Sequence, residues 1–280
     1  MSGSRFARVT GAAEELPAYA LPVEQASERR VLADWPHVVT REWAWGGSSG
    51  EGVRVCIVDS GIDPDHPLVG TVREAVTPAG EGVETDEHGD ANGHGTACAG
   101  IVRAIAPDCE IASVRVLGPD IGGTGRDLLA GLRWAIDSGY AVINLSLSTT
   151  RRAFIEPLHE LADRAYFRRC VIVSAAHNLP VDSWPWRFAS VLSVAGHTGN
   201  DPREFYVNPT PPVEFLARGV DVEVPWPGGA TIRVSGNSLA APHLAGICAL
   251  IMAKHPTVTP AQLKSMLYLT AANVDAAQTR

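Results

Sequence analysis

Short apolar, β-branched runs alternate with amphipathic stretches through the middle of the chain. Five runs have the length and composition of buried strands: 53–58, 111–117, 141–147, 170–173 and 191–195. Three stretches have the small apolar residues or the helical spacing that predict helices: 94–104, 127–138 and 155–167. Strands that alternate with helices predict an α/β fold with a mostly parallel sheet and helices on both faces.

The two ends of the chain have different patterns. Residues 1–45 show no clear periodicity, so we expect an N-terminal extension over 1–40 and one domain over 41–280. Residues 79–93 are rich in glycine and acidic residues and predict a loop. The last third is rich in loops and β-like segments until a long apolar helix predicted at 238–254. A closing helix follows at 259–271, with Thr259 as its N-cap and Pro260 in its first turn.

Composition and charge argue against some classes of function. A formal net charge of −8 disfavours binding of nucleic acid through the overall field. No run approaches the roughly 18 apolar residues that cross a bilayer, so we expect no membrane association. The basic N-terminus lacks a following apolar segment, so no secretory signal is expected. Five cysteines, without a Cys-x-x-Cys spacing, predict free buried thiols and a reducing, cytoplasmic location.

Three polar segments carry candidate chemistry. Asp59 follows the first predicted strand, and ligands in open α/β sheets gather beyond the carboxyl ends of strands. His94 stands between two glycines, which allow close approach of the backbone. Ser238 lies where a loop enters an apolar helix. Each residue alone has an ordinary explanation as a turn former, a loop histidine or an N-cap. Together, in the order Asp, His, Ser, they predict a triad for nucleophilic catalysis.

These segments also carry a family resemblance. Asp59-Ser-Gly-Ile, Gly93-His-Gly-Thr and Gly236-Asn-Ser-Leu-Ala-Ala-Pro-His resemble the three signatures of the subtilases, the subtilisin-like serine proteases. Other segments resemble family segments in the same order: 113–117, 142–146 and 219–222. The resemblance spans roughly residues 41–275 and implies a subtilisin-like three-layer fold. It also implies that Ser238 is the nucleophile, His94 the general base and Asp59 the carboxylate that orients the histidine.

The resemblance implies an oxyanion hole and a substrate-binding surface. Asn178 resembles the family's oxyanion asparagine, and the backbone N–H of Ser238 is a second donor. An extended peptide substrate is expected to pair with two segments, formed by Gly123, Thr124 and Gly125 and by Ser146, Leu147 and Ser148.

The chain departs from the family pattern near this surface. Asn237 replaces the usual threonine before the nucleophile, and His177 replaces a glycine beside Asn178. A positive φ at His177 would strain the backbone and displace Asn178. Trp184 and Trp186 could narrow the primary substrate pocket or simply pack in the core. Cys98, four residues after His94, is expected on the same helix face, close to the triad.

The resemblance implies a serine endopeptidase that acts on peptide or protein substrates without a cofactor. Many relatives bind structural calcium, but the acidic run of Asp86, Glu87 and Asp90 is typical of a solvated loop, so no metal site is predicted. The expected role is cytoplasmic peptide processing, such as cutting a leader from a precursor peptide. Two alternatives remain. One is a peptide macrocyclase or transpeptidase, in which an amine resolves the acyl-enzyme, and the other is a non-catalytic peptide-binding relative.

Overall fold

The computed structural model describes residues 19–28, 35–80 and 82–275. The chain divides into two compact units, residues 1–37 and 38–280. The first unit contains the short helix α1 (Val23–Glu28). The second contains every other helix and strand that the structure describes, and with them all the residues of the predicted site.

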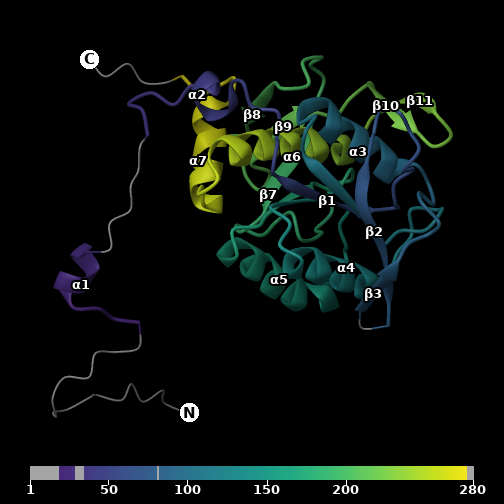
Figure 1. Cartoon of the computed structure of the whole chain (residues 1–280), viewed down its shortest axis with the longest axis horizontal. Helices are drawn as coiled ribbons and strands as arrows, with labels where there is room; N and C mark the ends of the chain where they lie inside the picture. Colours follow the sequence, from purple (N-terminus) through teal and green to yellow (C-terminus); the bar gives the residue numbers. More distant parts are fainter. Residues whose placement is uncertain (1–18, 29–34, 81, 276–280) are drawn as a thin grey trace, which may run out of the picture. The chain divides into compact units, whose positions relative to one another are not determined.

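A central sheet organises the second unit (Figure 1), with nine strands among the described residues in the order β3-β2-β4-β1-β5-β6-β7-β9-β8. The strands are β1 (Arg54–Asp59), β2 (Val72–Ala79), β3 (Gly82–Thr85), β4 (Glu110–Arg115), β5 (Val142–Leu145), β6 (Val171–Ala175), β7 (Leu192–His197), β8 (Phe205–Val207) and β9 (Phe215–Arg218). All neighbours from β2 to β9 pair in parallel. Only the edge strands β3 and β8 are antiparallel to their partners. The predicted parallel sheet is confirmed.

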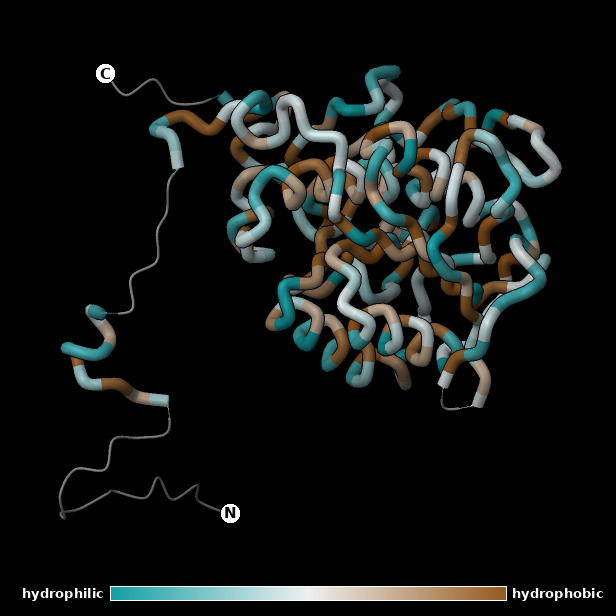
Figure 2. Tube along the Cα trace, in the orientation of Figure 1, coloured by the Kyte–Doolittle hydropathy of each residue, from teal (hydrophilic) through white to brown (hydrophobic). Residues whose placement is uncertain are grey.

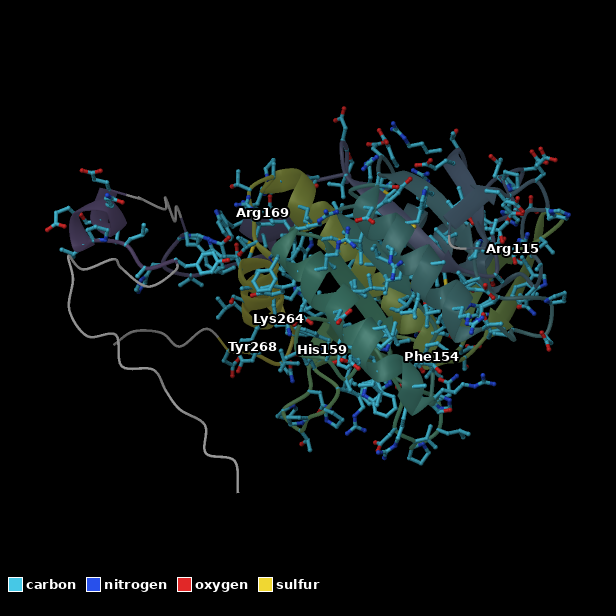
Figure 3. The ribbon with its side chains drawn as sticks, turned by 90° about the horizontal axis from the view of Figure 1, so that it is seen from below. Arg115, Phe154, His159, Arg169, Lys264 and Tyr268 are labelled. Carbon is cyan, nitrogen blue, oxygen red and sulfur yellow. The ribbon has the colours of Figure 1, made fainter. Side chains whose placement is uncertain are left out.

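Helices cover both faces of this sheet, as predicted (Figure 1). On one face lie α3 (His94–Ile105) and α6 (Asn237–Lys254), which pack against each other. On the other face lie α4 (Gly125–Asp137) and α5 (Ile155–Phe167), the face that Figure 3 views from below. Two further helices, α2 (Arg41–Trp45) and α7 (Pro260–Thr270), pack beside α6. A hairpin of β10 (Val222–Trp226) and β11 (Ala230–Val234) lies against α3.

Apolar side chains fill the space between the layers. Figure 2 shows the hydrophobic stretches of the chain gathered along the central strands and α6. Residues 239–251 of α6 are all buried, because the helix lies between the sheet and other helices. The five cysteines are buried and free, which confirms the predicted thiols. None of the described helices is long and apolar enough to cross a membrane.

The strands β2 and β3 were not among the predicted elements. β3 lies within residues predicted as a loop, and it pairs with β2 at the edge of the sheet. Both strands are largely exposed or half-buried, so the apolar run that marks a central strand is missing. At the other end of the chain, the predicted cap is confirmed. Thr259 and Gln262 form a reciprocal capping box at the start of α7, with Pro260 at its first position.

Candidate active site

The carboxyl ends of three adjacent strands bring the predicted residues to one edge of the sheet. Asp59 is the last residue of β1, while Ser146 follows β5 and Asn178 lies three residues after β6. The helix that carries the histidine and the helix that carries the serine both begin at the same edge. His94 is the first residue of α3, and Ser238 is the second residue of α6. Segments that are far apart in sequence therefore meet at one place.

The carboxylate of Asp59 is hydrogen-bonded to the imidazole of His94. The distance from His94 Nδ1 to Asp59 Oδ1 is 2.8 Å, and the aspartate side chain is fully buried. The same oxygen accepts the backbone N–H of Ser60 at 2.8 Å. Because an ionised carboxylate only accepts, Nδ1 of His94 carries the proton, and Nε2 of the neutral ring is free to accept another.

This pair changes the acid–base behaviour of the histidine. Burial acts to lower the pKa of His94, but it is opposed by the charge of Asp59, by Cys98 and by the hydrogen bonds to both. Together these effects hold the pKa of His94 well above its usual value. His94 is thus a stronger base than an isolated imidazole.

A close backbone contact fixes the start of α3. A Cβ atom on Gly95 would lie 1.9 Å from the carbonyl oxygen of Gly61, so only glycine fits there. The contact presses the first turn of α3 against the chain that leaves β1. It therefore sets the spacing between Asp59 and His94, as the flanking glycines in the sequence predict.

Asp90 is a hydrogen-bond centre in the loop before the histidine. One carboxylate oxygen accepts the hydroxyl of Ser60 at 2.7 Å and the backbone N–H groups of Asn92 and Gly93 at 2.9 and 2.7 Å. The other accepts the N–H and the hydroxyl of Thr96 at 2.8 and 2.5 Å. Asp90 thus joins the residue after the triad aspartate to both sides of the triad histidine. It was expected to be part of a solvated loop, and the structure corrects that expectation.

The rest of the acidic run does not fit a calcium cage. Both oxygens of Asp86 accept hydrogen bonds from the guanidinium of Arg115, at 2.9 and 2.8 Å, and the side chain of Asp86 is fully buried. Glu87 is exposed. The oxygens of Asp86 are therefore taken by an arginine and those of Asp90 by its five donors. Such engaged oxygens do not offer a cation the free ligands that it needs.

A proline in α6 sets how the backbone at Ser238 is held. Pro242 has no N–H to donate to the carbonyl oxygen of Ser238 four residues earlier. That oxygen instead accepts the hydroxyl of Ser146, at 2.7 Å. The hydroxyl of Ser146 in turn accepts the side-chain amide of Asn144, at 3.0 Å. The candidate nucleophile is therefore tied to the end of β5.

Cys98 lies between the members of the triad. Its sulfur is 3.9 Å from Nδ1 of His94, 3.9 Å from Oδ2 of Asp59 and 4.0 Å from the carbonyl oxygen of Ser238. The thiol is fully buried, and burial raises its pKa although the neighbouring His94 acts to lower it. The predicted place of Cys98 beside the triad is confirmed.

The side-chain amide of Asn178 lies beside the candidate nucleophile. Its Oδ1 accepts the backbone N–H of Asn237 at 2.9 Å, whereas its Nδ2 has no hydrogen-bond partner among the described residues. A Cβ atom placed on Gly236 would lie 3.2 Å from Ser238 Oγ and 3.6 Å from Asn178 Nδ2. The hydroxyl and the free amide donor therefore flank the same small space. His177 has no positive φ, so the strain considered for it is not present.

A cavity of about 330 Å³ opens at this edge of the sheet. All six residues predicted to contact substrate line it, as do Asn178 and Ser238. Its apolar lining includes Leu117, Leu128 and Leu147. Next to it, the ring of Phe154, labelled in Figure 3, lies where a side chain on Gly125 would have to go.

The two tryptophans are packing residues and do not line this cavity. Trp184 pairs through its backbone with Thr149, and its side chain packs against the core. Trp186 is buried and donates its indole N–H to the hydroxyl of Ser183 at 2.8 Å. The hydroxyl of Ser148 also bonds to Ser183, at 3.0 Å. The tryptophan segment is thus hydrogen-bonded to Ser148 and Thr149, which line the cavity.

Known proteins resemble this chain along most of its length. The sequence model of the subtilase family matches residues 50–280. Subtilisin DY of Bacillus licheniformis is 32% identical over 243 residues, which are 81% of this chain and 86% of that protein. Subtilisin E of Bacillus subtilis (strain 168) is 31% identical over 240 residues, which are 80% of this chain and 62% of that protein.

Solved structures share the fold. The crystal structure of a cold adapted subtilisin-like serine proteinase matches with a TM-score of 0.67 and 25% identity, over 84% of this chain and 87% of that one. Sphericase matches with a TM-score of 0.69 and 25% identity, over 78% of this chain and 83% of that one. With the family match over residues 50–280 and relatives above 30% identity, the chain belongs to the subtilase family of serine endopeptidases.

Proposed function

We propose that the chain hydrolyses peptide bonds through an acyl-enzyme formed on Ser238. Nε2 of His94 takes the proton of the Ser238 hydroxyl as Oγ attacks the carbonyl carbon of the substrate. The imidazolium then gives this proton to the amine that leaves, and a water molecule attacks the acyl-enzyme in the same way. The observation that carries the proposal is the 2.8 Å hydrogen bond between Asp59 and His94, beside a cavity lined by Ser238.

We assign the stabilisation of the oxyanion to Asn178 and to the backbone N–H of Ser238. The first N–H groups of a helix have no partner within the helix, and Ser238 stands in the first turn of α6. The free Nδ2 of Asn178 lies beside the same hydroxyl. Donors held in place before the reaction stabilise the charge that develops on the substrate oxygen.

The proposed substrate is an extended peptide that enters between two segments of backbone. Gly123, Thr124 and Gly125 line the cavity, and so do Ser146, Leu147 and Ser148. Pairing through main-chain hydrogen bonds is largely independent of the substrate's sequence. The apolar part of the cavity would accept an apolar side chain of the substrate.

Labelling with a fluorophosphonate probe tests the nucleophile. Because the probe reacts only with an activated serine, wild-type protein should be labelled and Ser238→Ala should not, while its circular dichroism stays unchanged. Ser235→Ala is the matched control. This exposed serine is three residues away, and among the described residues its hydroxyl bonds only to the backbone N–H of Asp221. Undiminished labelling of Ser238→Ala would contradict the assignment.

We further propose a processing role in a reducing compartment such as the cytoplasm. The free state of all five cysteines supports this, since paired thiols are the rule in oxidising compartments. Mass spectrometry of the products from a library of peptides tests the role. A processing enzyme should cut a small set of sequences and give products with water added. Uniform cutting of all sequences would contradict the processing role, and cyclic or amine-joined products would show peptide transfer instead.

A further inference from the structure

The side chain of Asn237 joins two segments of backbone beside the oxyanion site. Its Oδ1 accepts the N–H of Gly196, in β7, at 2.8 Å. Its Nδ2 donates to the carbonyl oxygen of His177, in the loop after β6, at 3.2 Å. Asn237 is also the first residue of α6, immediately before Ser238. One side chain thus connects the end of the sheet, the loop that carries Asn178 and the helix that carries Ser238.

The backbone of Asn237 holds the side chain of Asn178 directly. As the first residue of a helix, Asn237 has an N–H group without an intrahelical partner. This N–H donates to Oδ1 of Asn178 at 2.9 Å. Because the oxygen of the Asn178 amide is occupied in this way, its Nδ2 is the atom left to face the cavity. The main chain and the side chain of Asn237 therefore act on Asn178 from two directions.

Close packing of the backbone leaves this arrangement little freedom. The N–H of Gly236 donates to the carbonyl oxygen of Gly219 at 2.8 Å. A Cβ atom on Gly219 would lie 2.7 Å from Cα of Gly196. Gly219, which follows β9, is therefore packed between the chain before α6 and β7, where the Asn237 amide is anchored. Loss of that amide would release the loop of Asn178, whereas the packing of α6 on the sheet would remain.

We infer that Asn237 is the positioning residue of the oxyanion site: its amide fixes Asn178 relative to Ser238. The inference rests on the proposed role of Asn178 as an oxyanion donor. It assigns Asn237 no contact with the substrate and no part in proton transfer. Its effect on catalysis passes through Asn178 alone, and this makes the inference testable with a double-mutant cycle.

The cycle compares four proteins: wild type, Asn178→Ala, Asn237→Ala and the double variant. Asn178→Ala should lower kcat about 10²–10³-fold, the usual effect of losing one oxyanion donor. Asn237→Ala should lower kcat about 10- to 10²-fold with KM changed less than about twofold, because misplacement of a group weakens only the transition state. In the Asn178→Ala background, the same Asn237 substitution should change kcat by less than about twofold, since residues that act as a unit are not additive.

Asn208→Ala is the matched control. The side chain of Asn208 also joins backbone groups, those of Thr210 and Val213, but it lies outside the site. Its removal should leave kcat unchanged in both backgrounds. Asn237→Asp provides a second variant of nearly equal volume in case Asn237→Ala does not fold. It keeps the acceptor for Gly196 and places an oxygen against the carbonyl of His177, so the same pattern of kcat values is expected.

The outcomes separate the inference from the proposed function. If Asn178→Ala lowers kcat and Asn237→Ala lowers it by the same factor in both backgrounds, Asn237 has a general structural role and the inference is overturned. If Asn237→Ala and Asn237→Asp leave kcat unchanged, it is overturned as well. If Asn178→Ala itself leaves kcat unchanged, the oxyanion assignment fails and the inference fails with it.

Discussion

Cys98 brings a soft, reactive atom to within 4 Å of every member of the triad. A small mercurial that reaches the sulfur would displace the imidazole of His94 and stop catalysis. We expect inhibition to be slow, because the thiol is fully buried and burial raises its pKa. Time-dependent loss of peptidase activity measures it.

Cys98→Ser should keep activity and lose most of this sensitivity. Cys109→Ser is the matched control, because Cys109 is also buried but lies after the end of α3, outside the site. Inhibition of Cys98→Ser as strong as that of the parent protein would show that another cysteine reacts.

The pKa of His94 predicts the pH dependence of activity. His94 must be neutral to accept the serine proton, and its pKa lies well above the usual value because of Asp59 and Cys98. The value of kcat/KM should therefore rise with pH, with its acid limb above about pH 6.5.

Asp59→Asn removes the charge that raises this pKa. The acid limb should move to lower pH, and kcat should fall by about 10⁴-fold through loss of the correct tautomer. An NMR titration of His94 in Ser238→Ala protein, with and without Asp59→Asn, measures the same shift without catalysis. An unchanged titration midpoint would mean that Asp59 is not the source of the raised pKa.

The residues of the site differ in how far sequence could predict them. Asp59, His94 and Ser238 have recognisable neighbours and a characteristic order, so the pattern along the chain is enough. The hydrogen bond from Ser146 to Ser238 joins residues 92 positions apart, and those of Asn237 join residues 41 and 60 positions apart. Such bonds depend on which segments the fold brings together. No local pattern shows that a serine hydroxyl will reach the carbonyl of a helix in another part of the chain.

At the scale of the element, the start of α3 depends on Asp90. Asp90→Ala leaves its five donors without their acceptor, and it should lower the free energy of unfolding by about 2–4 kcal/mol. It should also lower kcat, because the loop before His94 loses its anchor. Urea denaturation and steady-state kinetics measure the two effects. Glu87→Ala, at an exposed position of the same acidic run, should change neither. Equal stability of the two variants would contradict this role of Asp90.

Among the elements, burial decides which ones sequence could predict. The strand β1 and the four other strands predicted with it are apolar runs because helices cover both faces of the sheet. The strands β2 and β3, at one end of the sheet, lack such a run, since many of their residues are exposed. β2 pairs with β4 and β3 pairs with β2, and local propensity does not show these pairings. The helices were easier to predict, because α4 and α5 each keep one apolar face against the sheet.

At the scale of the whole molecule, the boundary between the two compact units predicts where the chain can be shortened. A protein without residues 1–37 should fold and react with a fluorophosphonate probe as the full chain does, because the site lies in the unit that begins at residue 38. Thermal unfolding and labelling measure this. An insoluble or unlabelled product would show that the first unit is needed to form the second.

Removal of residues 1–46 is the matched control, because it also deletes α2. This helix is bound to α6 and α7 by specific contacts. Arg41 donates to the carbonyl of Thr270 at 2.9 Å, and Lys254 donates to the carbonyls of Glu42 and Gly46 at 2.7 and 2.8 Å. The ring of Trp43 lies 4.5 Å from that of His255. The longer truncation should therefore lower the melting temperature clearly, whereas the shorter one should not.

Acid should destabilise the fold through a buried histidine in α6. Burial lowers the pKa of His243 to about 4, and its Nδ1–H donates to the carbonyl of Leu239 at 2.7 Å. Because the unfolded chain binds this proton at about pH 6.5, the folded state loses stability as the pH falls from 6.5 to 4. The loss amounts to about 3 kcal/mol.

His243→Gln keeps a donor for Leu239 and does not titrate. Its free energy of unfolding should therefore fall less than that of the wild type between pH 7 and pH 4, as measured by urea denaturation. His159→Gln, at a half-exposed position on α5 that Figure 3 labels, should behave as the wild type does. Equal acid sensitivity of all three proteins would show that other groups govern the loss.

The hydrogen bond from Ser146 to the carbonyl of Ser238 has a consequence for moving this site to another protein. Because Pro242 has no N–H, the helix supplies no donor for that carbonyl, and Ser146, directly after β5, donates to it instead. The position of the nucleophile is thus fixed relative to the sheet, not by the helix that carries it. A graft of the serine loop and its helix alone would carry Ser238 without the Ser146 hydroxyl that holds its carbonyl in place. The smallest portable unit is the helix together with the end of β5.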